Sequence, residues 1–200
     1  MLEPDWNQKR PETTVAAIRG LWKDLRIELC PEVVAPADRL LAALRKTHVN
    51  GGAEFATFSV AGGPAFHWFL SRNRLDEIEF PEHFLKSPVV TDALRKFCKE
   101  PVADSFGFEW GSAFTLAGEV AQTLAQGGAY IKHEGGAGEA FTIADNFRRS
   151  LFSDRFDEIR VVKSFKPWSA WFYDVAWDRT WLVVDKRHSK VSLLAVTDTD

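Results

Sequence analysis

Cysteine, methionine and tyrosine are scarce in this chain, which has two, one and two of them among 200 residues. Cys30 and Cys98 are far apart and form no CxxC pair, so we interpret both as small buried apolar side chains. No apolar run approaches the roughly 18 residues that a membrane-spanning helix needs. The polar, acidic start MLEPDWNQKRPE has no basic segment followed by an apolar one. We therefore expect a cytoplasmic protein without a membrane partner.

An excess of positive charge is also missing. Lys and Arg number 25 against 28 Asp and Glu, which gives a formal net charge of −3. A protein that holds a nucleic-acid backbone normally presents a clustered basic surface. We therefore expect no nucleic-acid partner.

Sequence motifs that are typical of catalytic or metal-binding sites are absent as well. The sequence contains no HExxH, no GxSxG and no GxxxxGK[ST] pattern. No two of its histidines stand at the spacing of metal ligands. The five are His48, His67, His83, His133 and His188. We therefore expect no metal and no cofactor, since a metal site would need residues that are distant in sequence.

Tryptophan and phenylalanine are abundant, with eight and sixteen residues. So many large rings indicate an aromatic-rich core, with some rings at a surface where they bind something. A chain of this length can bury one substantial core and is only marginally long enough for two domains. We therefore expect a loose segment over residues 1–10 and a single domain over residues 11–200.

The stretch 168–197 has the pattern of a three-strand antiparallel meander. Three apolar, aromatic and β-branched runs are separated by short polar clusters at Asp178-Arg179 and Arg187-His188. Turns at those clusters pair Asp174 with Val183 in the first hairpin. In the second hairpin they pair Asp185 with Lys190 and Val183 with Ser192.

Because side chains alternate along a strand, this register gives the meander two faces. The core face carries no charge and comprises Trp171, Tyr173, Val175, Trp177, Thr180, Leu182, Val184, Val191 and Leu193. The mixed face places carboxylates beside large apolar groups and comprises Phe172, Asp174, Trp181, Val183, Asp185, Lys190, Ser192 and Leu194.

The rest of the chain predicts the elements that surround the meander. Apolar periodicity and capping residues predict helices over 11–29, 36–50, 87–99, 112–126 and 139–152. Alternation or short apolar runs predict strands over 54–60, 65–71, 129–132 and 158–164, and the segments 72–86 and 101–111 are expected to be loops. The order predicts an α+β fold, an antiparallel β-sheet with a C-terminal three-strand meander covered by about five helices.

The passage HEGGAG is a candidate anion site. Lys132 lies just before it, and Gly135, Gly136 and Gly138 could free backbone N–H groups at a helix start to surround a phosphate. Two glutamates, Glu134 and Glu139, would repel such a ligand, and a flexible surface turn is the competing interpretation.

The mixed face carries two functional hypotheses. In the first, the chain is a non-catalytic binding or accessory protein, which holds a protein partner or self-associates. The contact residues are Phe172, Asp174, Trp181, Asp185 and Lys190, with Phe106, Phe108 and Trp110 as further exposed aromatics.

The second hypothesis is a small-molecule enzyme or ligand-binding protein with a cleft floored by Asp174 and Asp185. Two nearby carboxylates can hold different protonation states and share acid and base work, which makes both of them candidate catalytic residues. The simpler alternative pairs Asp185 with Lys190 across the strands and points Asp174 at solvent. A deep pocket over the mixed face favours the second hypothesis, and a flat surface favours the first.

Overall fold

The computed structural model describes residues 4–31, 34–94 and 106–200, which form an α+β fold around one antiparallel sheet. The strands follow the order β1-β2-β6-β5-β4-β3 across the sheet. They are β1 (Arg26–Cys30), β2 (Gly52–Ala61), β3 (Glu109–Gly111), β4 (Ile159–Ser164), β5 (Arg179–Asp185) and β6 (Lys190–Thr197). The predicted fold class is confirmed.

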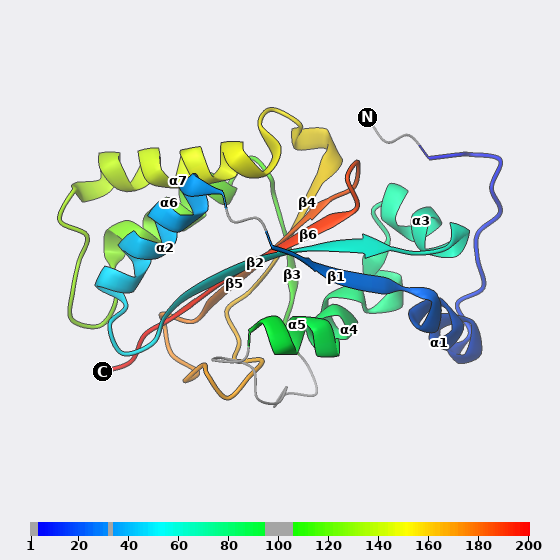
Figure 1. Ribbon diagram of the computed structural model, residues 1–200, viewed down its shortest axis with the longest axis horizontal. Coiled ribbons are helices and arrows are strands. Elements are labelled where there is room, and N and C mark those ends of the chain that lie inside the picture. The colour runs from blue at the N-terminus through cyan, green and yellow to red at the C-terminus, as the bar shows by residue number, and fades with distance from the viewer. Residues whose placement is uncertain (1–3, 32–33, 95–105) are drawn as a thin grey trace.

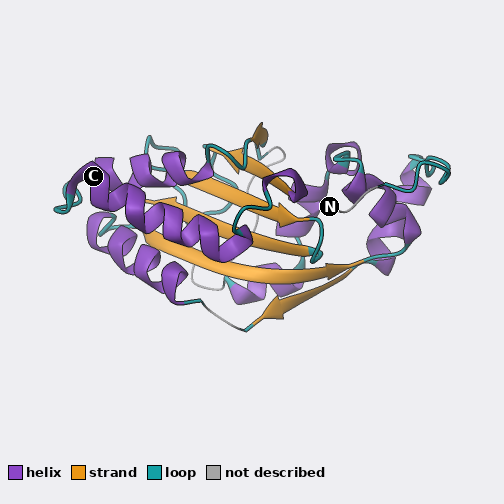
Figure 2. Ribbon diagram, turned by 90° about the horizontal axis from the view of Figure 1, so that it is seen from above, coloured by secondary structure: helices purple, strands orange, loops and turns teal. Residues whose placement is uncertain are grey.

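Helices cover both faces of this sheet (Figures 1 and 2). One layer contains α2 (Ala35–Thr47), α6 (Leu116–Gln126) and α7 (Gly136–Phe152). The other side carries α1 (Val15–Asp24), α3 (Pro64–Ser71), α4 (Phe80–Leu85) and α5 (Pro88–Ala93), with the 3₁₀ helix η1 (Leu75–Ile78). A second 3₁₀ helix, η2 (Phe156–Glu158), leads into β4.

The C-terminal meander exists, but its first strand differs from the prediction. The second hairpin has the expected register, with Asp185 opposite Lys190 and Val183 opposite Ser192. The partner of β5 on its other side is β4, so Val183 lies opposite Val161 and the predicted pairing with Asp174 is wrong.

The segment between β4 and β5 is a loop, because buried rings of this segment pack into the core and its backbone does not pair with a strand. Trp168 and Phe172 are 1% and 6% exposed, and their ring centroids are 5.3 Å apart. The indole Nε1 of Trp168 donates to Thr180 Oγ1 at 2.8 Å. The predicted core position of Tyr173 is also wrong, since its side chain is half exposed.

Both faces of the meander are buried, and each belongs to its own hydrophobic cluster. Leu182, Val184, Val191 and Leu193 pack under the α3–α5 side, as the core-face assignment predicts. Trp181, Val183 and Leu194 pack with α2, α6 and α7 on the opposite face. A second helical layer therefore covers much of the face that the sequence marks as mixed.

Three of the five predicted helices correspond directly to α2, α6 and α7, and the strands predicted over 54–60 and 158–164 correspond to β2 and β4. The helix predicted over 87–99 begins as expected with α5, while residues 95–99 lie outside the described part of the chain. The helix predicted over 11–29 is too long, because it ends at Asp24 and Arg26–Cys30 pairs with β2.

Two predicted strands are wrong for local reasons. Residues 65–71 form α3, whose Pro64 stands in the first turn, where a missing N–H costs nothing. A short apolar run does not by itself distinguish a strand from a buried helix. Residues 129–132 form no strand, and Gly128 N donates to Ile131 O in a turn.

The loop predicted over 72–86 is wrong too, because η1 and α4 bury their apolar side chains there. In the described residues, no helix combines the length and the apolar character needed to cross a bilayer.

Candidate functional site

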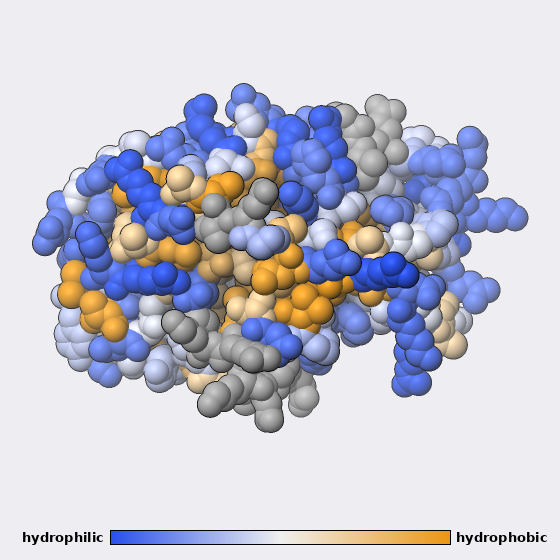
Figure 3. Space-filling model, in the orientation of Figure 1, coloured by the Kyte–Doolittle hydropathy of each residue, from blue (hydrophilic) through white to orange (hydrophobic). Residues whose placement is uncertain are grey.

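A cleft of about 410 Å³ opens over the face of the sheet that the α2–α6–α7 layer covers only in part. It lies where α7 ends and α2 begins, above β1, β2, β6 and β5. Its lining includes Glu28, Leu29, Cys30, Val34, Phe55, Thr57, Ser59, Leu151, Val183, Asp185, Lys190 and Ser192. In Figure 3, which has β1 and α2 at the front, apolar surface gathers near the middle of the view beside charged groups.

The floor of the cleft consists of two rows of side chains that run across four strands. Sheet register places Asp185 beside Lys190, Lys190 beside Ser59 and Ser59 beside Glu28. The next row runs through Val183, Ser192, Thr57 and Cys30. Cross-strand partners point to the same face of a sheet, so both rows face the cleft.

The second row contains a direct hydroxyl pair, since Thr57 Oγ1 and Ser192 Oγ are 2.9 Å apart. With Ser59 in the neighbouring row, these groups form a hydroxyl strip, Thr57, Ser59 and Ser192. Each hydroxyl can donate and accept, so the strip can hydrogen-bond to a polar ligand edge of either kind.

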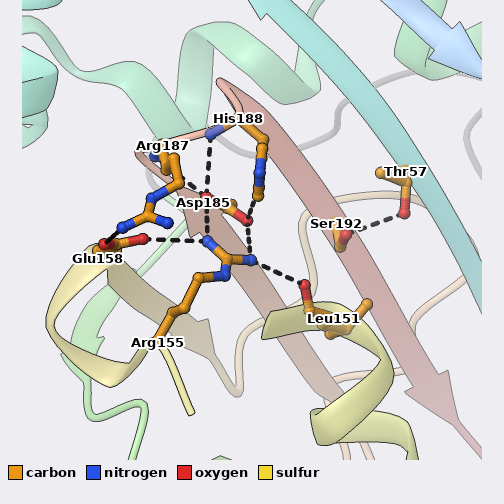
Figure 4. A network of polar contacts seen from close by, with 8 residues as sticks. All are labelled: Thr57, Leu151, Arg155, Glu158, Asp185, Arg187, His188 and Ser192. Atoms are coloured by element: carbon orange, nitrogen blue, oxygen red, sulfur yellow. Dashed lines mark hydrogen bonds and ion pairs between the residues drawn. The ribbon is translucent and has the colours of Figure 1, made fainter. Parts of the chain in front are cut away.

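Asp185 closes one end of the cleft and is held by a dense set of donors (Figure 4). Arg155, from the connection between α7 and β4, donates from Nη1 to Oδ1 at 2.9 Å and from Nη2 to Oδ2 at 2.6 Å. His188 Nδ1 lies 2.9 Å from Oδ2. The backbone N–H groups of Arg187 and His188 donate to Oδ1, each at 3.1 Å.

These contacts keep Asp185 ionised. Burial alone raises the pKa of the carboxyl, but hydrogen bonds from Arg155 and His188 outweigh burial and lower the pKa to about 2. A general acid needs a pKa near the working pH. The arrangement therefore suits Asp185 as a fixed anchor at the cleft wall and does not suit proton transfer at neutral pH.

A second carboxylate extends this anchor. Glu158 is buried and accepts from Arg155 at 3.3 Å and from Arg187. Arg155 thus bridges the carboxylates of Glu158 and Asp185, and this bridge connects the end of η2 to the end of β5.

Asp174 is not brought to this cleft. It lies in the loop before β5 with φ of 58°, while Asp185 ends that strand. Seven residues of extended chain separate the two ends of β5 by about 20 Å. The expected diagonal contact of Asp174 with Asp185 is therefore wrong. The expected Asp185–Lys190 ion pair is wrong as well, because the carboxylate binds Arg155 and His188 instead.

The two large rings predicted at a binding surface lie inside the protein. Trp181 is 1% exposed, and its Nε1 donates to Glu119 Oε2 at 3.1 Å under the helical layer. Phe172 packs in the cluster on the opposite side of the sheet. Phe106 is also fully buried, Phe108 is half-buried, and Trp110 keeps 44% of its surface exposed.

The predicted anion site lies at the start of α7, at the opposite end of that helix from Leu151 at the cleft. Gly135 precedes the helix, Gly136 begins it and Gly138 lies within its first turn, while Lys132 is exposed. A Cβ built on Gly135 would overlap the Glu139 carboxylate. That carboxylate already stands at the helix start, which leaves the position poorly suited to a second anion.

No family model, curated protein or solved structure matches this chain. Within the described ranges, no group of three or more His, Cys, Asp or Glu side chains is placed to hold a metal ion.

Sequence reasoning finds Asp185, Lys190 and Ser192 but misses the opposite wall of the cleft. Glu28 falls in the helix predicted over 11–29, so its place on an edge strand could not be inferred. The interpretation of Cys30 as a buried apolar side chain is wrong, because its thiol is partly exposed at the cleft. Thr57 and Ser59 alternate with the buried Phe58 and Val60, and that polar alternation on β2 was the available signal. For Arg155, the sequence carries no comparable signal.

Proposed function

We propose that this protein binds a small organic molecule in the cleft over β1, β2, β6 and β5. The observation that carries the proposal is the volume of the cleft above a floor of mixed chemistry. Its volume of about 410 Å³ falls within the range of small-ligand sites, roughly 300–1,000 Å³. A flat surface over the same residues would favour the protein-partner hypothesis instead.

The lining indicates a ligand with one polar edge and one apolar face. The hydroxyl strip supports hydrogen bonds along the floor, while Phe55, Val34 and Leu151 provide apolar lining. Glu28 and Lys190 flank Ser59 with opposite charges. A neutral or zwitterionic polar molecule with an apolar part matches this arrangement better than a strongly charged one.

Binding is favoured over catalysis because the one deeply set acid is saturated with donors. The oxygens of Asp185 accept from Arg155 and from the backbone N–H groups of Arg187 and His188, and its low pKa keeps it ionised. Binding of a protein partner through Phe172 and Trp181 is less favoured, because both rings contribute to the core.

We also propose that the protein acts in the cytoplasm. Cys30 is a free thiol at the cleft wall, and a reducing compartment keeps such a thiol available. The net charge of −3 supports a partner other than nucleic acid.

Cys30 offers a direct test of the cleft. In a Cys98→Ser background, Cys30 can form reversible mixed disulfides with a library of small fragments that are supplied as disulfides under partly reducing conditions. Fragments that combine hydroxyl or amide groups with a ring should be retained, as intact-protein mass spectrometry would show. Analogues of those fragments that lack the thiol should then protect Cys30 from alkylation.

A matched pair of variants separates the cleft from general surface effects. Ser59→Leu places apolar bulk on the floor, and Thr142→Leu adds similar bulk at an exposed position of α7. Selected fragments should lose about tenfold or more in affinity with Ser59→Leu and keep their affinity with Thr142→Leu. Uniform retention of all fragments, or equal loss in both variants, would rule out a selective site here.

A further inference from the structure

The strand β1 forms one open edge of the sheet. It pairs with β2 on one side only, and in Figure 2 it lies at the lower margin of the sheet with no helix drawn beyond it. The opposite edge strand, β3, has three residues, whereas β1 has five in unbroken register with β2. Natural edge strands usually avoid further pairing through shortness, bulges, prolines or lysines. The β1 sequence, RIELC, contains no proline or lysine and no bulge, so this edge is able to accept another strand.

The main-chain groups of β1 that point out of the sheet belong to Ile27 and Leu29. Val60 N donates at 2.8 Å to the carbonyl oxygen of Ser189, just before β6, so the main chain of Val60 faces β6. Because this direction alternates along an antiparallel strand, the neighbours of Val60 bond to β1, and its partner Ile27 points away from β2. The same alternation turns the main chain of Leu29 outward. Among the described residues, neither outward main chain has a hydrogen-bond partner.

Two hollows flank this edge. The cleft lies on the α2 side, and a groove of about 540 Å³ lies on the α5 side. Glu28 lines both of them. The apolar lining of the groove includes Trp22, Leu25, Ile27 and Val89. Side chains alternate between the two faces of a strand, so a strand added beside β1 directs its side chains alternately toward the cleft and the groove.

The charges of β1 select the partner, which we propose is a second copy of this chain, paired antiparallel through β1 about Ile27. This register places Arg26 of each copy opposite Glu28 of the other. Both side chains are exposed, and among the described residues neither forms an ion pair within its own chain. Leu29 then lies opposite Leu25, whose backbone is already extended, with φ of −75° and ψ of 127°. Because Glu28 also lines the cleft, the dimer adds Arg26 of one copy to the edge of the other copy's cleft.

Other registers of the same edge are less favourable. Pairing about Glu28 sets two glutamates directly opposite each other, which is destabilising. Pairing about Leu29 sets Ile27 opposite Pro31, which has no N–H to donate. The register about Ile27 instead covers Leu29, which is 47% exposed, against Leu25 of the other copy. The interface is small, so we expect a reversible dimer with a Kd of about 10–100 µM.

Sedimentation velocity of the full-length protein in reducing buffer tests this, at concentrations from about 2 to 400 µM. We expect a reversible monomer–dimer equilibrium. Arg26→Glu and Glu28→Arg should each weaken dimerisation by about tenfold or more, and the double variant should recover it to within about threefold, because opposite charges again face each other. Lys132→Glu, the same charge change at an exposed residue before α7, should leave dimerisation unchanged. A monomer at every concentration, equal weakening by Lys132→Glu, or a double variant no better than the single ones would overturn the proposal.

Disulfides between copies then establish the register. In a Cys30→Ser, Cys98→Ser background, Arg26→Cys chains mixed with Glu28→Cys chains should form a disulfide between unlike chains when treated with oxidised glutathione. Opposed residues of this kind have Cα atoms about 4.5 Å apart, which a disulfide can span, and the mixed dimer keeps its other Arg26–Glu28 pair. Each variant alone should cross-link at least about fivefold less, because its two thiols are offset along the strands. A disulfide formed chiefly between two Glu28→Cys chains would contradict the pairing about Ile27.

Discussion

Arg155 and Asp185 form a bidentate ion pair with N–O distances of 2.9 and 2.6 Å, which joins the end of the helical layer to the end of β5. The two residues are thirty positions apart in sequence. Because the pair stands at the cleft wall, it fixes the position of the wall relative to the floor formed by β6 and β2. Several consequences of this geometry can be measured.

Removing the charge of Asp185 should destabilise the fold. Asp185→Asn leaves the guanidinium of Arg155 without its main partner in a site where both side chains are mostly covered. We expect a loss of about 2–3 kcal/mol in the free energy of unfolding, measured with urea. Glu54→Gln, which breaks the more exposed ion pair between Arg45 and Glu54, should cost less than about 1 kcal/mol. Similar losses in both variants would contradict the anchoring role.

The Asp185 carboxylate should also make the free energy of unfolding depend on pH in the acid range. The folded pKa of Asp185 is about 2, below its ordinary value of 3.8, so its ionised form is favoured by folding. This contribution, about 1–2 kcal/mol after allowance for solvent screening, is complete above pH 4 and is lost as the pH falls toward 2. Urea unfolding of the unaltered protein and of Asp185→Asn should converge over that interval. A constant difference down to pH 2 would refute the assignment.

Buried histidines should add a second pH dependence nearer neutrality. Burial lowers the pKa of His48 and of His83 below the ordinary value of 6.5. The unfolded chain therefore binds protons first as the pH falls, and stability should decline below about pH 6.5. Replacing both by Gln should flatten the stability profile between pH 7 and 5. The NMR titration of each ring should give a midpoint below the ordinary histidine pKa of 6.5.

Trp181 should behave as a core residue. Its indole is 1% exposed and is held by Glu119, whose pKa is lowered because hydrogen bonds from Lys163 and Trp181 outweigh burial. Trp181→Ala should cost about 3–5 kcal/mol through the cavity that it creates. Trp110→Ala, at a ring that is 44% exposed, should cost less than about 1 kcal/mol. Thermal unfolding of the two variants distinguishes a core ring from a surface ring.

Local pattern was sufficient for much of the sheet. Alternation along β5 and β6 correctly sorts Leu182 and Val184 from Trp181 and Val183, because neighbouring side chains on a strand must point to opposite faces. The short polar cluster at Arg187-His188 also sets the register of the second hairpin. These features depend on residues within one hairpin, which the sequence brings together by itself.

The local sequence pattern gave wrong predictions where the strand that pairs with a segment lies far along the chain. The aromatic run from Trp168 to Trp177 has strand-like composition, yet β4 takes the place beside β5, and the rings of Trp168 and Phe172 pack in the core. Likewise Leu29 fits a helical repeat, but in the structure it lies on β1 opposite Phe58 of β2. Tertiary packing decides between such alternatives because each short segment alone has nearly equal preferences.

The sequence by itself determined the α+β class, the second hairpin with its register and the acid at the end of β5, since these follow from local alternation and turn chemistry. Only the tertiary structure decided that helices bury both faces, that Arg155 neutralises Asp185 and that a cleft remains between α7 and β1. Those outcomes depend on contacts between residues distant in sequence, and burial and charge compensation are properties of that assembled environment.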